Sequence, residues 1–267
     1  MSVFSDLHRP GAPFVLVNVW DVGTARLAEG LGAMAIATSS AAQAFTLGRT
    51  DGGVTLDECL AHAAALADAV SVPLAIDFED GFAERPEAVA ANVGRAAATG
   101  AAGISIEDWR GDGGGAFEPT LAAERIAAAS EAARATGLHL TARADGVMHG
   151  AYGVDAAVRR LDAFARAGAD CLYAPVLPDE GALAEVVALG RPVNGLAAGD
   201  WLRWDLSDWA RAGVARVSLG STLARFAQRT LLDAVRTLID DGRLTALRHK
   251  PVADEIDRFL QTGAPRA

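Results

Sequence analysis

Asp77-Phe78-Glu79-Asp80-Gly81 follows a short apolar run at 72–76, and this stretch decides the fold we expect. We predict that the run is a buried strand and that Gly81 lets the chain turn away from it. Because successive side chains of an extended strand point to opposite faces, Asp77 and Glu79 should point the same way. Two carboxylates in one pocket repel each other unless a cation lies between them, and Mg²⁺ suits a few carboxylates plus water. Solvated acids in a loop are the simpler alternative.

Apolar runs and helical patterns alternate along the chain. Strands that are apolar throughout and alternate with helices indicate a parallel sheet covered by helices. Eight such units within 267 residues predict an α/β fold of the (β/α)₈ TIM-barrel type. The predicted strands are 14–19, 34–38, 72–76, 103–106, 138–142, 171–174, 192–196 and 215–219. The predicted helices are 24–31, 55–70, 86–100, 120–136, 155–167, 180–189, 206–212, 221–240 and 252–260.

An open doubly wound sheet is the competing fold. Its nucleotide signature, G-x-G-x-x-G, should follow the first strand, but residues 21–26 read Asp-Val-Gly-Thr-Ala-Arg. No linker or compositional break divides the chain, so we predict one domain, 1–267, in which 221–267 is a C-terminal helical segment. The apolar surplus of that segment predicts packing against another subunit, so that we expect a homo-oligomer.

Charge and cysteine usage limit the partners and the compartment. The formal charge of −10 argues against nucleic acid and anionic membranes as partners. Cys59 and Cys171 lie far apart and show no metal-binding or redox spacing, which fits a reducing, cytoplasmic setting. No apolar run approaches the roughly 20 residues of a membrane helix, and residues 1–13 hold no signal core.

Polar side chains stand where the predicted strands end, and barrel enzymes carry their catalytic residues at those ends. They are Ser39, Ser40 and Asp51 after the second strand, Asp77, Glu79 and Asp80 after the third, Glu107 and Asp108 after the fourth, and Arg143 and Asp145 after the fifth. Each alone is explained by a loop or a salt bridge. Together, unpaired acids would be costly to bury. A metal that neutralises them would leave Arg143 free to bind an anionic substrate with two parallel hydrogen bonds.

Short motifs at these strand ends resemble the isocitrate lyase / phosphoenolpyruvate mutase superfamily, and within it the phosphoenolpyruvate phosphonomutase branch. The resemblance runs from residue 18 to residue 220. The matching pieces are Asn18-Val19-Trp20-Asp21, Ala37-Thr38-Ser39-Ser40, Leu47-Gly48 followed by Asp51, residues 77–82, residues 103–108, Ala142-Arg143-Ala144-Asp145 and Val217-Ser218-Leu219-Gly220. It implies a Mg²⁺-dependent barrel that makes or breaks a C–C or P–C bond next to a 2-oxo acid.

The resemblance also implies roles for particular residues. Asp77 would ligate Mg²⁺, with Asp51, Glu79 and Glu107 holding its waters. Arg143 would bind the substrate carboxylate, while Ser39, Ser40 and the Ala41 backbone would bind its other oxygens. Arg143, Asp51 and Glu107 are therefore the candidate catalytic residues, and Asn194, within the seventh strand, is a further candidate substrate contact. The final helix would be exchanged between the subunits of a tetramer or dimer.

The chain departs from the family pattern in two places. The segment after the fourth strand, 110–118, reads Arg-Gly-Asp-Gly-Gly-Gly-Ala-Phe-Glu. It lacks the Lys-Cys-Gly stretch of isocitrate and methylisocitrate lyases, whose Cys acts as an acid, and also the Lys and Asn of the mutase. Glu79 replaces an Asp seen in many members. The glycines suit a loop that closes over the site, although a flexible connection would contain them as well.

These observations favour a Mg²⁺-dependent lyase-type enzyme that makes or breaks a C–C bond of a small 2-oxo or 2-hydroxy carboxylate through a pyruvate-like enolate. A P–C mutase or hydrolase acting on phosphonopyruvate is one alternative, although a phosphoryl group would need further cationic or amide donors. A relative that binds metal or ligand without catalysis is an alternative of another class.

The composition of the 110–118 segment predicts which substrates the protein does not cleave. Cleavage of isocitrate or 2-methylisocitrate releases a carbanion that must be protonated, and a positioned acid contributes about 10²–10⁴-fold. The segment offers only Asp112 and Glu118, which are ordinarily ionised at neutral pH. We therefore expect purified protein with Mg²⁺ to release neither glyoxylate nor pyruvate from these two substrates at a useful rate. Rapid release from either one would contradict this interpretation of the segment.

Overall fold

A computed structural model describes residues 3–111, 113–249 and 253–262. Its eight parallel strands follow one another in chain order and close into a barrel, which confirms the predicted (β/α)₈ fold. The strands are β1 Phe14–Asn18, β2 Ile36–Ala37, β3 Leu74–Asp77, β4 Gly103–Glu107, β5 His139–Arg143, β6 Cys171–Tyr173, β7 Val193–Leu196 and β8 Arg216–Ser218. Register pairs such as Glu107 with Arg143 place the ends of neighbouring strands side by side.

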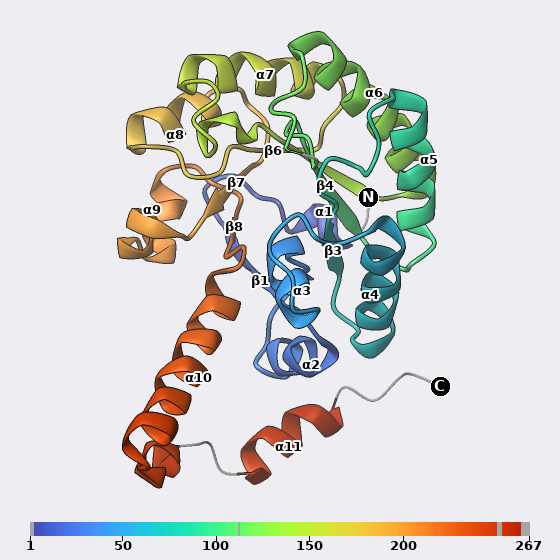
Figure 1. Ribbon diagram of the computed structural model, residues 1–267. Helices are drawn as coiled ribbons and strands as arrows, with labels where there is room; N and C mark the ends of the chain where they lie inside the picture. The colour runs from blue at the N-terminus through green and yellow to red at the C-terminus, as the bar shows by residue number, and fades with distance from the viewer. Residues whose placement is uncertain (1–2, 112, 250–252, 263–267) are drawn as a thin grey trace.

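Helices surround the barrel (Figure 1). The α-helices are α1 Val3–Asp6, α2 Val22–Gly30, α3 Ser40–Thr46, α4 Leu56–Ala69, α5 Pro86–Ala97, α6 Pro119–Thr136, α7 Val154–Arg166, α8 Glu180–Val187, α9 Leu206–Arg211, α10 Thr222–Asp241 and α11 Ala253–Thr262. Three 3₁₀ segments are η1 Asp145–Val147, η2 Gly199–Arg203 and η3 Leu244–His249. Most bounds differ from the predicted ones by a few residues, as helix and strand ends commonly do.

Local signals explain several helix starts. Thr55 caps α4, and its side chain and that of Glu58 bond to each other's backbone amides, which forms a capping box. Pro86 opens α5 at a position where a missing N–H costs nothing. Two helices were not predicted: α3, where we expected a loop, and α1, whose Phe4 is 1% exposed and packs edge-on against Phe14. Phe4 helps to close the end of the barrel opposite the carboxyl ends of the strands.

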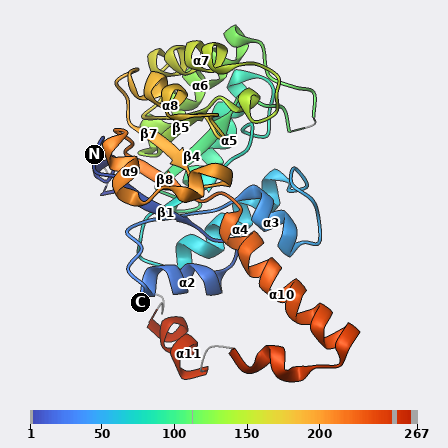
Figure 2. The same ribbon diagram turned by 90° about the vertical axis from the view of Figure 1, so that its left-hand side faces the viewer.

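The last helices leave the barrel and return to it. α10 projects away from the barrel, and α11 lies beneath α2 in both views (Figures 1 and 2). Arg26 on α2 donates to the Leu260 carbonyl at 3.0 Å, and a Cβ at Gly30 would lie 2.5 Å from the Phe259 ring. In this single chain α11 therefore packs on its own α2, and exchange of the final helices between subunits stays a prediction. Among the described residues, no helix has the length and apolar content of a membrane span.

Gly195 in β7 provides a test of the packing between the barrel and α9. A Cβ at this position would lie 2.4 Å from the ring of Trp209, which is 3% exposed. We expect Gly195→Ala to lower the free energy of unfolding by about 1–3 kcal/mol, because a packed core resists overfilling. Gly94→Ala in α5 is the matched control, since its Cβ would meet nothing within 4 Å. The control should stabilise by about 0.4–1 kcal/mol in urea titrations, and a neutral Gly195→Ala would contradict the packing described here.

Candidate active site

A pocket of about 260 Å³ opens among the carboxyl ends of the strands. Among the predicted side chains at strand ends, Asp77 and Arg143 line this pocket, and Glu107 contacts it through Arg143. Asp77 is the last residue of β3, Glu107 of β4 and Arg143 of β5. Ser40 begins α3 directly after β2, and Asp51 lies in the loop between α3 and α4. Residues far apart in sequence thus meet at one mouth of the barrel.

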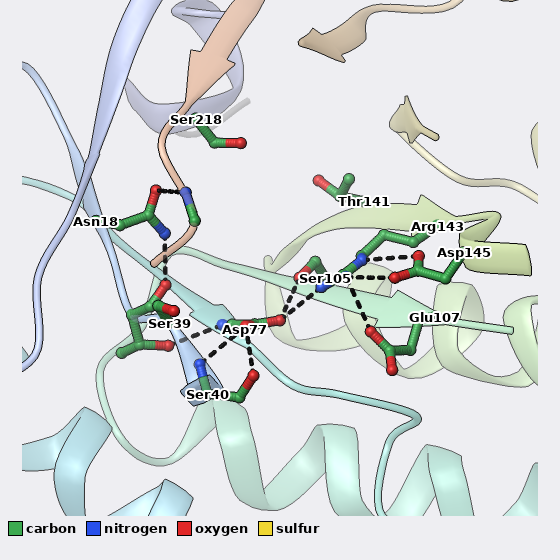
Figure 3. A network of polar contacts seen from close by, with 12 residues as sticks. Asn18, Ser39, Ser40, Asp77, Ser105, Glu107, Thr141, Arg143, Asp145 and Ser218 are labelled. Carbon is green, nitrogen blue, oxygen red and sulfur yellow. Dashed lines mark hydrogen bonds and ion pairs between the residues drawn. The ribbon is translucent and has the colours of Figure 1, made fainter. Parts of the chain in front are cut away.

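Asp77 is the most highly connected acid of the mouth. Its Oδ2 accepts hydrogen bonds from the backbone N–H and the hydroxyl of Ser40, both at 2.9 Å. Its Oδ1 accepts from Arg143 Nη1 at 2.7 Å and from the Ser105 hydroxyl at 3.5 Å. The Thr38 hydroxyl accepts from the Asp77 backbone N–H at 2.8 Å. The carboxylate is therefore held between the start of α3 and the ends of β4 and β5 (Figure 3).

Arg143 is bound by three carboxylates, and whether a metal would free its guanidinium for a substrate stays a prediction. The carboxylate of Asp145 accepts hydrogen bonds from Arg143 Nε at 3.1 Å and from Nη2 at 2.5 Å. The Glu107 carboxylate lies 3.0 Å from Nη2, and the Asp77 carboxylate lies 2.7 Å from Nη1 (Figure 3). The Arg143 side chain is only 12% exposed. Although burial opposes its charge, Asp145, Glu107 and Asp77 hold the pKa of Arg143 above its usual value. Arg143 thus joins β3, β4 and β5 in one ion cluster.

Only one of the two acids at the end of β4 faces the mouth. Glu107 reaches Arg143, and burial raises the pKa of Glu107 well above its usual value. Asp108 accepts bonds from the Tyr152 hydroxyl at 2.6 Å, from Arg160 at 3.0 Å and from the Asp145 backbone N–H at 2.8 Å. Asp108 therefore anchors η1 and α7 on the other side of the strand.

Glu79 lies beside the acidic mouth, where it lines a neighbouring pocket with Asp80 and Gly111, and its position has a different cause from the one predicted. β3 ends at Asp77, and Glu79 has a φ of 44°, so strand alternation does not orient it and that argument was wrong. The turn nevertheless buries Glu79 to 8% exposure, and among the described residues its buried Oε1 has no hydrogen-bond partner. Desolvation, followed by the charges of Asp77, Asp51 and Asp80, raises the pKa of Glu79 to about 8.

The residues after β2 form the opposite wall. The Ser39 hydroxyl accepts from the Ala42 N–H at 3.3 Å and caps α3, while Ser40 is committed to Asp77. Ala41 lines the pocket in the first turn of α3, where a backbone N–H has no carbonyl of its own helix to bond. Asp51 also lines the pocket, and desolvation and the charge of Asp77 raise its pKa.

Asn194 lies in β7 and lines the same pocket, but its amide is engaged by protein groups. Its carbonyl oxygen accepts from Arg216 Nε at 2.7 Å, and its NH₂ donates to the Ser218 hydroxyl at 2.8 Å. The amide is buried at 2% exposure. Direct contact between Asn194 and a substrate stays a prediction.

Several residues that support the site were not among the predicted site residues. Asn18 donates to the Thr38 carbonyl at 2.7 Å and accepts from the Leu219 and Gly220 N–H groups at 2.8 and 2.9 Å. It therefore joins the ends of β1, β2 and β8. The position of Asn18 at the end of an apolar strand is the sequence signal that could have predicted this role.

Arg125 on α6 was also missed. Its guanidinium is 1% exposed and donates to the carbonyls of Asp80, Ala83 and Glu107, with Ala83 at 2.9 Å and Glu107 at 3.4 Å. It thereby fixes the turn after β3 against the end of β4. The sequence around Arg125, an arginine within an Ala-rich helix, does not predict this contact.

The segment after β4 folds as a short hairpin in its described part. Trp109 pairs with Ala116, Arg110 forms an ion pair with Glu84 at 2.9 Å, and the Gly111 N–H donates to Asp80 at 3.1 Å. Asp112 lies outside the described residues. The hairpin is thus tied to the turn that carries Glu79 and Asp80.

The donor set fits a hard cation. Asp51, Glu79 and Glu107 all have raised pKa values, and Oε1 of Glu79 has no hydrogen-bond partner among the described residues, so a cation at the mouth would favour the ionised forms of these acids. In the described parts of the chain, no three His, Cys, Asp or Glu side chains converge closely enough to hold a metal directly. The arrangement therefore suits Mg²⁺, which keeps several waters and uses one or two carboxylates.

Comparison with known proteins identifies the family. Residues 4–239 match the family model described as phosphoenolpyruvate phosphomutase. An uncharacterized protein of Mycobacterium tuberculosis is 34% identical over 246 residues, 90% of each chain. The 2-methylisocitrate lyase of Escherichia coli K12 is 32% identical over 186 residues, 62% of each chain.

Solved structures agree with this. A Burkholderia cenocepacia J2315 protein, provisionally described as a lyase/mutase, has a TM-score of 0.91 and 40% identity, covering 96% of this chain and 94% of that one. A phosphonopyruvate hydrolase solved with oxalate and Mg²⁺ shares the fold, with a TM-score of 0.82, 23% identity, and 97% and 94% coverage. The barrel and its acidic mouth define an enzyme of the lyase and mutase class. The chain belongs to the phosphoenolpyruvate phosphomutase family, within the isocitrate lyase / phosphoenolpyruvate mutase superfamily.

The raised pKa of Glu79 predicts how stability depends on pH. Between the unfolded pKa of about 4.5 and the folded pKa of about 8, the folded protein binds more protons than the unfolded chain. The free energy of unfolding should therefore fall as pH rises through this window when divalent cations are chelated. In Glu79→Gln the decrease in the free energy of unfolding over this pH window should be smaller by at least about 1 kcal/mol, because the amide cannot ionise.

Urea unfolding at pH 5 and pH 8.5 in chelator measures this difference. Glu87→Gln on α5 is the control, because that carboxylate is 69% exposed. Equal pH slopes for wild-type protein and Glu79→Gln would show that Glu79 ionises normally in the folded state.

Proposed function

We propose that this protein is a Mg²⁺-dependent lyase that makes or breaks a C–C bond of a small 2-oxo or 2-hydroxy carboxylate through a pyruvate-like enolate. The observation that carries the proposal is the cluster of Asp77, Glu79, Glu107 and Arg143 at the mouth of a barrel whose family contains lyases and mutases. Acids with raised pKa values around one arginine are costly unless they bind something cationic.

Asp77 is the residue we expect to ligate Mg²⁺, with Asp51, Glu79 and Glu107 binding its waters. The ion, when bound, supplies positive charge that stabilises negative charge developing on the substrate. The phosphonopyruvate hydrolase solved with oxalate and Mg²⁺ supports this choice through its fold. In this chain, the unpartnered oxygen of Glu79 provides a buried acceptor for a bound water.

The chain's own groups would orient the substrate. Arg143 shares its Nη1 with Asp77, and a substrate carboxylate at the mouth would compete with Asp77 for that edge of the guanidinium. The Ala41 N–H, in the first turn of α3, would donate to a substrate oxygen. Because Asp145 holds the opposite edge of Arg143, the guanidinium is fixed in place before a ligand arrives.

The hairpin after β4 points to a reaction whose leaving group needs no protonation. Residues 110–118 contain no Cys, Lys or His. Oxaloacetate that loses CO₂, with the pyruvate enolate held at the mouth, is one such reaction. A P–C bond reaction on phosphonopyruvate is the competing assignment, and the assay below includes it.

Two measurements test the proposal. Calorimetry with Mg²⁺ and oxalate, a planar mimic of the enolate, should show binding to wild-type protein. Asp77→Asn should abolish Mg²⁺ binding and activity without unfolding the protein, because the amide oxygen can still accept from Ser40. Asp57→Asn on α4 is the control, since this exposed carboxylate pairs with Arg95 at the surface, away from the mouth. Unaltered Mg²⁺ affinity in Asp77→Asn would place the metal elsewhere.

Turnover assays distinguish the C–C bond reaction from the P–C bond reaction. Purified protein with Mg²⁺ should release pyruvate from oxaloacetate faster than from phosphonopyruvate. Faster release from phosphonopyruvate would assign the P–C reaction instead. Binding of Mg²⁺ and oxalate without turnover of any 2-oxo acid would indicate a relative that binds ligand without catalysis.

We also propose that the protein forms a homo-oligomer through α10. Leu231, Val235 and Ile239 are spaced four residues apart on one face and are 64%, 45% and 78% exposed. An apolar stripe of this kind is typical of an interface. Sedimentation should show a dimer or tetramer, and Val235→Asp should shift it toward monomer. Thr230→Asp, which adds the same charge outside the stripe, should not; a monomeric wild-type protein would refute the proposal.

A further inference from the structure

Tyr173 is a phenol inside the pocket that the proposed function does not use. It is the last residue of β6, lines the pocket and is 8% exposed. In the sheet register it lies beside Arg143 on one side and Asn194 on the other. The guanidinium carbon of Arg143 is 5.2 Å from the centroid of the Tyr173 ring, within the range of a cation–π contact. A substrate carboxylate bound to Arg143 would therefore lie close to this ring.

A chain of hydrogen bonds approaches Tyr173 from the other side. Arg216 Nε donates to Asn194 Oδ1 at 2.7 Å, and the Asn194 NH₂ donates to the Ser218 hydroxyl at 2.8 Å. The Ser218 hydroxyl has the Gly195 carbonyl as a distant acceptor at 3.4 Å and also hydrogen-bonds Tyr173. Because the Ser218 oxygen accepts from Asn194, its own proton can be donated to the Tyr173 oxygen. The Tyr173 O–H can then donate to a ligand, and the positive charge at the head of the chain favours the phenolate that remains.

The phenol holds its proton at neutral pH. Burial raises the pKa of Tyr173, while the charge of Arg143 and the hydrogen bond with Ser218 oppose that rise. The α-carbon of a 2-oxo acid is a weaker acid than a phenol, so that proton transfer from the phenol to an enolate carbon is favourable. The proton is therefore present when an enolate forms, and the same two neighbours stabilise the phenolate after the transfer.

Other ionisable groups in the described lining of the pocket are unsuited to this transfer. The ionisable side chains that line it are Asp51, Asp77, Arg143, Tyr173 and Arg216. Asp51 and Asp77 would be ionised with a cation bound, and guanidinium groups do not give up their protons in proteins. Loss of CO₂ from oxaloacetate needs no proton on the leaving group, but the enolate that stays behind must take one at carbon. Within this lining, Tyr173 is the ionisable group that can supply it.

We propose that Tyr173 is the general acid that protonates the enolate carbon. This deepens the proposed function and rests on it. The phenolic O–H bond breaks and leaves its electron pair on oxygen. The proton forms a C–H bond with the π electrons of the enolate, whose C–O bond becomes a carbonyl again. Water entering at the mouth then returns a proton to the phenolate, so that one proton is consumed per turnover.

Hydrogen exchange into pyruvate isolates this step, because its reverse removes a proton from the methyl group. We expect wild-type protein with Mg²⁺ in D₂O to replace the methyl protons of pyruvate by deuterium, measured as loss of the methyl ¹H NMR signal. Tyr173→Phe should slow this exchange by about 10²–10⁴-fold, the contribution typical of a positioned acid or base. Its affinity for oxalate, measured by calorimetry with Mg²⁺, should be retained, because oxalate takes no proton in the complex.

Tyr152→Phe is the matched control. It removes the chain's other phenol, which donates to Asp108 and is not part of the pocket lining. This variant should lose stability but keep the exchange. Ser218→Ala tests the proposal even if Tyr173→Phe does not fold. It leaves the phenol in place and removes a hydrogen bond that favours the phenolate, so that exchange should slow by about 10-fold.

The outcomes separate this inference from the proposed reaction. Exchange at the wild-type rate in Tyr173→Phe or in Ser218→Ala would overturn the role of Tyr173, as would a loss of oxalate affinity in Tyr173→Phe that matches the loss of exchange. Decarboxylation of oxaloacetate by wild-type protein without exchange into pyruvate would also overturn it and leave the proposed reaction standing. Exchange that depends on Tyr173, in a protein that turns over neither oxaloacetate nor phosphonopyruvate, would keep Tyr173 as a proton donor and remove the assigned reaction.

Discussion

The ion cluster around Arg143 is the interaction on which the site depends. One guanidinium binds Asp77, Glu107 and Asp145 and so joins the ends of β3 and β4 to β5 and the start of η1. Breaking a buried ion pair from one side commonly costs about 3–5 kcal/mol, because an uncompensated charge remains. The barrel supplies the geometry that holds this cluster together, because the ends of β3, β4 and β5 lie side by side.

Asp77 links this cluster to the opposite wall. The same carboxylate that contacts Arg143 accepts the backbone N–H and hydroxyl of Ser40 at the start of α3. A ligand that binds Asp77 would therefore affect the position of Arg143 and of α3, the helix that carries the Ala41 N–H. The two walls of the site are thus linked through the Asp77 side chain, and this link does not require the movement of a domain.

The pocket separates charges of opposite sign along the barrel axis. Burial and neighbouring acids raise the pKa of Glu79 beside the mouth, while the hydrogen-bond partners of Arg216 in the described part of the chain are neutral. A charge on either group is costly to bury without a partner of opposite sign.

The sequence by itself determined the barrel, because apolar runs, helix caps and strand-end polar residues are local patterns, and it placed Asp77, Glu107 and Arg143 at strand ends. It could not predict the turn at Glu79, whose φ of 44° ended the alternation that the prediction used. It also could not show that Asp77, Glu107 and Asp145 all bind Arg143. Only the tertiary structure decided that Arg216 meets Thr141, 75 residues away, since barrel closure and not sequence spacing sets which side chains share the interior.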